Sequence, residues 1–370
     1  MVSDELRVSG SATAYRVFDV GYAIALARAA PLLGESTAAQ VRPGRVEARA
    51  IEIRNPPLVA PLGPCVVTVG GQAFEGEVSA RLFDFGVCSV QLRLPAPANL
   101  TWAEFSSFGA AVSESTDVQT LLTDELQKLI ERVGPAIERP GVAPVSEEYI
   151  VFRIDRMSAD GKATVGERLN DERLVPLLLG ERRPLSASAR KELVPHRFSY
   201  HDDDLAVLTW ENALVVQPRY DDRDVEYVLE FANAQLLELR LFDYQLDGEL
   251  PSLYDRVAAA RARRRFRSSG RFRGVLADLQ TRVADITETV ERVENSLKVT
   301  DDVYLARIYA AALQLFREDA WRRGIERKLR ILRETYAMLN SEAQVARAEL
   351  LEIAIVVLIV AELVVGLLRH

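Results

Sequence analysis

The residue types best suited to chemistry gather in one short segment. His196 and His201 lie five residues apart, and Asp202, Asp203 and Asp204 follow directly. Imidazole nitrogens and carboxylate oxygens both bind divalent ions, so the segment could form a metal-dependent catalytic site. It also comes just before a predicted strand, where acidic loop residues are common. We favour a structural loop and keep metal-dependent catalysis as an alternative.

Other catalytic patterns are weaker. The segment GGQAFEG lacks the Lys-Ser/Thr pair of a phosphate loop and does not open a predicted helix. Cys65 and Cys88 are too few for a zinc site or a disulfide framework. We therefore expect no catalytic residue, no cofactor and no metal, and a protein that is not an enzyme.

Positive charge concentrates in one arginine-rich segment. Its members are Arg261, Arg263, Arg264, Arg265, Arg267, Arg271 and Arg273. Such a cluster suits phosphates, either of RNA, as on a ribosome, or of anionic lipid headgroups. The net charge of −8 argues against a general affinity for polyanions, and a solvated helix face or a contact with an acidic part of the same protein is the alternative.

The elements that must position these residues are mixed. A length of 370 residues, with 48% apolar and 27% charged residues, predicts a globular protein of more than one domain. From Cys88 to Leu94 apolar residues alternate with polar ones, which predicts a strand with one buried and one solvent-facing side. Gly70-Gly71 predicts a hairpin turn. Thr101 with Glu104, and Thr116 with Gln119, fit the capping box that begins a helix.

The chain beyond Pro251 is almost entirely helical in pattern. A bundle seam with 3–4 spacing predicts a coiled coil that packs within a helix bundle or between chains of a homo-oligomer. A second stripe begins at Ile325, Leu329 and Leu332 and leads into the C-terminal apolar stretch, which predicts a helical hairpin. The bundle seam consists of Leu276, Leu279, Val283, Ile286, Val290, Val293 and Leu297.

The last apolar stretch runs from Leu350 to Leu368. Its 19 residues approach the ~20 that a helix needs to cross a bilayer, and its basic flank lies upstream. This predicts a tail-anchored, single-pass protein of the cell inner membrane with its N-terminal bulk in the cytoplasm, in contact with membrane lipids. Glu362 would then be an intramembrane polar residue that joins helices in an oligomer. The alternative is a re-entrant helix, or one buried in a bundle, that never spans the membrane.

The expected fold class is α+β, with two mixed modules, a helical hairpin or coiled-coil region and one transmembrane helix. The predicted boundaries are a flexible leader at 1–10, modules at 11–135 and 146–250, the helical region at 251–347 and the transmembrane helix at 348–368.

Three segments carry a resemblance to a known family. Val225–Asp255 contains LEFANAQLLELR, Asp302–Phe316 reads DVYLARIYAAALQLF, and Leu350–Glu362 is an apolar run ending in an acidic residue. Together they resemble the "required for meiotic nuclear division" family, and the lack of an organelle transit sequence indicates a bacterial-type member. The resemblance implies an α/β part followed by helices and a membrane anchor, a homo-oligomer, and a link to translation, with no catalytic residues to transfer.

These observations predict a membrane-anchored, non-catalytic oligomeric scaffold or tether. One alternative is an RNA- or ribosome-associated membrane protein that supports translation. The other is a metal-dependent enzyme that uses the loop of His196, His201 and Asp202–Asp204.

Overall fold

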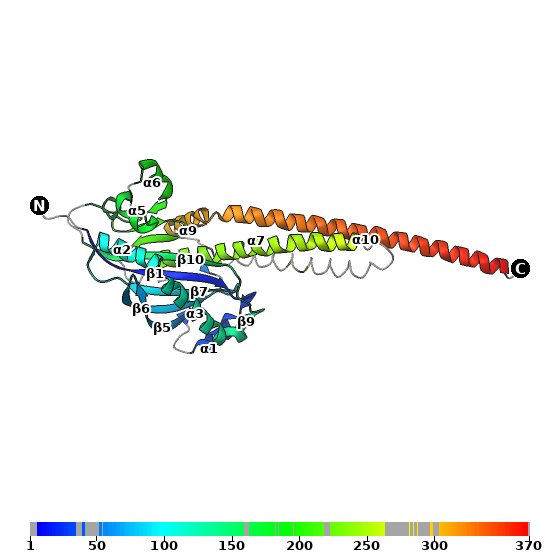
Figure 1. Ribbon diagram of the computed structural model, residues 1–370, viewed down its shortest axis with the longest axis horizontal. Helices are drawn as coiled ribbons and strands as arrows, with labels where there is room; N and C mark the ends of the chain where they lie inside the picture. Colours follow the sequence, from blue (N-terminus) through cyan, green and yellow to red (C-terminus); the bar gives the residue numbers. More distant parts are fainter. Residues whose placement is uncertain are drawn as a thin grey trace. The chain divides into compact units, whose positions relative to one another are not determined.

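In the computed structural model the chain forms two compact units (Figure 1). The sheet unit comprises Met1–Arg240 and Arg292–Asp319, and the helical unit comprises Leu241–Glu291 and Ala320–His370. The residues that the structure describes are 6–34, 39–40, 52–53, 55–158, 163–181, 183, 185–194, 196–217, 223–262, 281, 284, 287, 297–298 and 303–368.

The sheet unit is built on a ten-stranded sheet with the order β11-β12-β13-β10-β1-β7-β6-β5-β3, in which β8 pairs with β1. Neighbouring strands are antiparallel, except that β10 and β13 are parallel. The strands are β1 (Arg7–Asp19), β3 (Ala39–Gln40), β5 (Leu58–Val69), β6 (Gln72–Leu82), β7 (Val87–Pro95), β8 (Leu100–Thr101), β10 (Ser146–Met157), β11 (His196–Phe198), β12 (Leu205–Leu208) and β13 (Asn212–Val216).

Two short strand pairs and several helices complete this unit. The pairs are β2 (Ala23–Ile24) with β9 (Ile137–Glu138), and β4 (Glu52–Ile53) with β14 (Leu297–Lys298). The helices are α1 (Leu26–Leu33), α2 (Trp102–Ser113), α3 (Thr116–Val133), η1 (Gly134–Ala136), α4 (Val165–Arg168), α5 (Asp171–Leu179), α6 (Ala187–Leu193) and α9 (Val303–Leu315). Two long helices, α7 (Asp224–Ala262) and α10 (Glu318–Leu368), contribute residues to both units.

Local sequence explains several of these boundaries. Gly70 and Gly71 both have positive φ, at 57° and 80°, and turn β5 into β6 as the hairpin signal predicts. Thr101 and Glu104 form the predicted capping box at the start of α2. The second predicted box is wrong by one residue, because the Ser115 side chain caps α3.

Strands from both predicted modules join the same sheet. The central pair is β1 with β10, in which Ala14 lies opposite Ile150 and Tyr15 opposite Tyr149. The register of β1 begins at Val8 with Met157, so part of the predicted leader is strand. The chain before Ser146 and the chain after it therefore share one sheet rather than forming two.

One face of the sheet carries a large apolar core. Alternate residues of the central strands, such as Ala14, Leu92 and Phe152, are buried on this face. Leu122 of α3 and Phe105 of α2 belong to the same core cluster. Because side chains alternate along a strand, the residues between them point to the opposite face.

The helical unit contains the last part of α7 and most of α10. Nζ of Lys328 on α10 lies 2.6 Å from a carboxylate oxygen of Asp243 and 2.7 Å from one of Asp247, both on α7. The guanidinium of Arg333 donates a hydrogen bond of 3.3 Å to Oγ1 of Thr287. These bonds hold α10 against earlier helical residues of this unit.

The prediction of a transmembrane helix, and with it of a tail-anchored, single-pass inner-membrane protein, is wrong. In the described part of the chain no helix combines the length and the apolar character needed to cross a membrane. Glu352 and Glu362 interrupt the apolar stretch of α10. The uncharged run between them, Ile353–Ala361, rises about 14 Å as a helix, against about 30 Å for a hydrocarbon core.

Candidate functional site: a charged layer beneath α7

The densest set of chemically capable side chains lies where α7 covers the second face of the sheet. Every residue of α7 from Val225 to Leu239 is buried, polar and apolar alike. A helix that is buried all round is enclosed by its own fold. Figure 1 shows α7 beside β1 and β10, and side-chain contacts join it to both strands.

Two pairs of opposite charge form the centre of this charged layer. On β10, Nη1 of Arg153 donates to Oε1 of Glu226 at 3.1 Å, and its Nε donates to Asp155 at 2.8 Å. On β6, Arg81 forms an ion pair with Glu230. Arg153 and Glu230 are each 1% exposed. Glu226 and Glu230 of α7 thus both face arginines of the sheet, since residues four apart share one side of a helix.

The pKa shifts of the arginines follow from this burial. Burial opposes the charge of Arg153, but Glu226 and Asp155 outweigh it and raise the pKa of the guanidinium. Burial lowers the pKa of Arg81, although Tyr227 and Glu226 oppose the shift. A charge that leaves water needs a close partner of opposite sign, and α7 supplies both partners.

Tyrosines extend the layer beside the charges. Tyr15 and Tyr149 stack with ring centroids 5.8 Å apart. Nδ2 of Asn233 donates to the Tyr15 hydroxyl at 3.4 Å, and the Tyr149 hydroxyl lies 2.8 Å from the carbonyl oxygen of Asn212, to which it donates. Burial raises the pKa of both phenols, so they remain protonated and act as hydrogen-bonding groups.

The far end of the layer contains carboxyl groups with raised pKa values. Burial raises the pKa of Asp19 from 3.8 to about 7, while a hydrogen bond with the Glu238 side chain opposes the shift. Burial also raises the pKa of Glu147, against the opposing effect of its ion pair with Arg240. At neutral pH the Asp19 carboxyl therefore holds a proton part of the time.

The predicted metal or acid/base loop is organised as a turn. Oδ1 of Asp204 accepts a hydrogen bond of 2.7 Å from the backbone N–H of Tyr200, and the Tyr200 ring packs edge-on against His201. Burial lowers the pKa of His196. Among the described residues, no three His, Cys, Asp or Glu side chains gather as metal ligands would.

Most other predicted site residues lie outside the described part of the chain. This holds for Arg263, Arg264, Arg265, Arg267, Arg271 and Arg273, and for Leu276, Leu279, Val283, Ile286, Val290 and Val293. Arg261 lies in α7, but its side chain is outside the described set. Leu297 lies in strand β14 opposite Ile53, rather than in a helix. Glu362 is exposed on α10.

Sequence reasoning missed the charged layer. Its available signal was an arginine within each of two strands, Arg81 and Arg153, together with Glu226 and Glu230 at a helical spacing of four. Each charge alone is typical of a surface. Only their pairing across a helix and a sheet identifies them as buried.

Comparison with known proteins finds a family match within the sheet unit. Residues 9–222 match a family model described as the N-terminal domain of the uncharacterized protein MJ0711. The chain belongs to this family. The matched range ends just before α7 begins, so it includes Arg81 and Arg153 but not their partners on α7.

A relative from Methanocaldococcus jannaschii, named "Uncharacterized protein MJ0711", is 24% identical over 202 residues. The match covers 54% of this chain and 60% of the relative, so the chain spans less than two thirds of that protein's length. No solved structure matches the chain. The resemblance to the meiotic nuclear division family stays a prediction.

Proposed function

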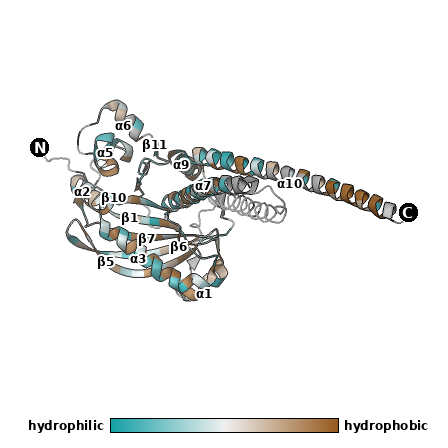
Figure 2. Cartoon of the chain, turned by 45° about the vertical axis from the view of Figure 1, so that its right-hand side comes forward, coloured by the Kyte–Doolittle hydropathy of each residue, from teal (hydrophilic) through white to brown (hydrophobic). Residues whose placement is uncertain are grey.

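We propose that the protein is a non-catalytic scaffold that works as a homo-oligomer. The observation that carries the proposal is the surface of α10 near its end, where Leu351–Val365 are exposed. Figure 2 shows this end of the helix as hydrophobic. Apolar patches of this kind mark interaction sites, because water does not solvate them favourably.

The charged layer supports a structural role for the sheet unit. A catalytic acid, base or nucleophile must reach its substrate, whereas Arg153 and Glu230 are almost fully buried and paired. The layer instead fixes α7 on the sheet at several points. Oppositely charged pairs favour one register of a packed helix over others, which suits a part that has to hold a defined shape.

The molar mass of the full chain in solution tests the proposal. One copy has a mass of 41.2 kDa. Analytical ultracentrifugation over a dilution series should give a defined multiple of this mass. A single-copy mass at every concentration would contradict the proposal.

The enzymatic alternative has its own test. The variant with both His196→Ala and His201→Ala should restore growth to a strain that lacks the gene as well as the parent does. Loss of function in a variant that remains folded and keeps the parent's mass would favour the loop as a reactive site. RNA or ribosome binding by the arginine-rich segment stays a prediction, because that segment lies outside the described residues.

A further inference from the structure

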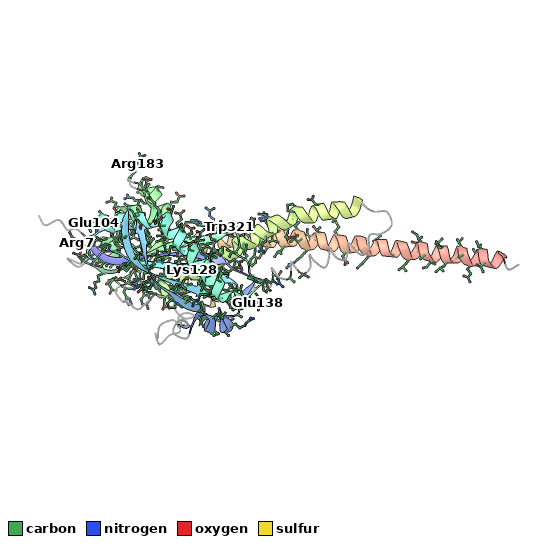
Figure 3. All side chains as sticks on the ribbon, turned by 60° about the horizontal axis from the view of Figure 1, so that its bottom comes forward. Arg7, Glu104, Lys128, Glu138, Arg183 and Trp321 are labelled. Atoms are coloured by element: carbon green, nitrogen blue, oxygen red, sulfur yellow. The ribbon has the colours of Figure 1, made fainter. Side chains whose placement is uncertain are left out.

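The end of α10 exposes eleven large apolar side chains on all sides of the helix. Their exposed fractions range from 50% at Val364 to 68% at Leu358. Figure 3 shows side chains standing out from α10 towards its C-terminal end. The eleven are Leu351, Ile353, Ile355, Val356, Val357, Leu358, Ile359, Val360, Leu363, Val364 and Val365.

One row of these residues continues a row that is buried earlier in the same helix. Ile325, Leu329 and Leu332 are buried within the structure. We define the C-terminal seam as Ile353, Val357, Val360 and Val364. Counting along the sequence from Ile325 in alternating steps of four and three residues leads to this seam without a break. A seam with this spacing faces a partner helix.

The acidic residues of the segment avoid this seam. In heptad notation the seam occupies d, a, d and a, which places Glu352 at c and Glu362 at f, both of which are outward positions. Each residue turns a helix by about 100°, so Glu362 lies roughly opposite the seam. Small residues, Ala354 and Ala361, occupy the flanking e position and allow close approach.

Resting on the proposed oligomeric function, we propose that three or more copies of this chain associate in parallel through the C-terminal seam. In a parallel bundle each layer of the core contains the same residue from every copy. All four layers are then β-branched. Two-stranded coiled coils favour Leu at d, whereas β-branched residues at both a and d favour three or four strands.

The residues at positions a, d and g set the apolar area of such an interface. Each of these side chains would remove about 60–120 Å² of apolar surface from water on full burial, as the usual transfer free energies imply. Six of the eleven exposed side chains occupy these positions and amount to an area on the order of 500 Å² per copy, which approaches the ~800 Å² per partner of a standard protein–protein interface. A dimer would cover only one side, and Val356 and Leu363 at position g widen the face beyond a two-stranded seam.

Matched charge substitutions test the seam. Val357→Asp with Val360→Asp places two charges in every bundle core, whereas Ile355→Asp with Leu358→Asp places two charges at outward positions b and f. We expect the parent and the outward variant to have at least three times the mass of 41.2 kDa. The seam variant should fall to the single-copy mass, a loss of at least threefold. All four positions are exposed, so we expect each variant to keep the fold of the single chain.

Each failure has its own signature. A parent that is monomeric, including one that binds phosphatidylcholine vesicles as a monomer, overturns the proposed function. If the parent is oligomeric and the seam variant is oligomeric too, only the proposed seam is wrong. The same holds if both variants lose the same share of the parent's molar mass. A dimeric parent overturns the stoichiometry. Orientation is read from Val364→Cys, which should form a disulfide between copies if they are parallel and fail to do so if they are antiparallel.

Discussion

The two faces of the large sheet are covered in different ways. On one face, α2 and α3 bury apolar residues such as Phe152 and Leu122. On the other, α7 buries arginines, carboxylates and tyrosines that pair with one another across the interface. Both sets come from the same strands, where neighbouring residues point in opposite directions.

The helices on the two faces therefore contribute in different ways. Apolar burial is non-directional and stabilises a helix in many orientations. Buried charges add little net stability, because desolvation offsets their attraction, but they are strongly destabilising when one partner is missing. The apolar face therefore supplies most of the stability, and the charged layer determines where α7 sits.

Breaking one buried pair should have the largest effect. Glu226→Ala removes a carboxylate partner from the buried guanidinium of Arg153, while Asp155 remains. We expect a loss of about 3–5 kcal/mol in the free energy of unfolding, as for other buried charges that lose a partner. Urea denaturation at neutral pH measures it.

The control removes both charges together. Adding Arg153→Met to Glu226→Ala should recover part of the loss, because an apolar side chain of similar length needs no counter-charge, although Asp155 then loses its ion pair with Arg153. If the double variant is as unstable as the single one, α7 is held by apolar contacts and the comparison between the two faces fails.

The apolar face should respond to a cavity instead. Leu122 of α3 is fully buried, and Leu122→Ala should reduce the free energy of unfolding by about 3 kcal/mol. This loss should be the same at low and high salt, since no charge is involved. A loss from Leu122→Ala that changes with salt would contradict the apolar character of this face.

The apolar face was predictable from the sequence and the charged face was not. Cys88, Val90 and Leu92 alternate with polar residues, and this period of two predicted both the strand and its buried side. The same pattern predicted that Ser89 faces water, yet Ser89 is 0% exposed, because α7 covers that side. A distant helix leaves no local trace in a strand.

The long helices show the same limit. Hydrophobic spacing predicted the helical character of α7 and α10, which depends on neighbours three and four residues apart. It could not distinguish an apolar helix end that crosses a membrane from one that meets other helices. Likewise, Arg81 and Glu230 are 149 positions apart in the sequence, and no spacing rule connects them.

A titration of the charged layer should give a smaller effect. The folded pKa of Asp19, about 7, lies above its ordinary value of 3.8, so folding favours the protonated carboxyl. This stabilisation is complete below pH ~4 and is lost as the pH rises through 7. At ~1.4 kcal/mol per pKa unit, the shift of Asp19 could reduce the free energy of unfolding by at most about 4 kcal/mol over this range. Because Asp19 is only partly buried, we expect a loss of about 2 kcal/mol.

Asp19→Asn provides the control, since its amide resembles the protonated acid and does not titrate. The stability of this variant should change less between pH 4 and pH 7 than that of the parent. Leu122→Ala should keep the parent's full pH slope. Equal slopes in the parent and Asp19→Asn would show that Asp19 does not hold its proton in the folded state.

The smallest effect should come from the exposed start of α2, the helix that covers the apolar face. The Thr101 side chain accepts from the backbone N–H of Glu104, whose carboxylate accepts in return from the N–H of Thr101. Thr101→Ala removes the first of these bonds and should reduce the free energy of unfolding by about 1 kcal/mol. Thr101→Ser, which keeps the hydroxyl, should lose much less.

Because the cap lies outside the apolar core, Thr101→Ala and Leu122→Ala should have additive effects. A loss from Thr101→Ala as large as that from Leu122→Ala would mean that the cap, rather than the apolar contacts, holds this cover on the sheet.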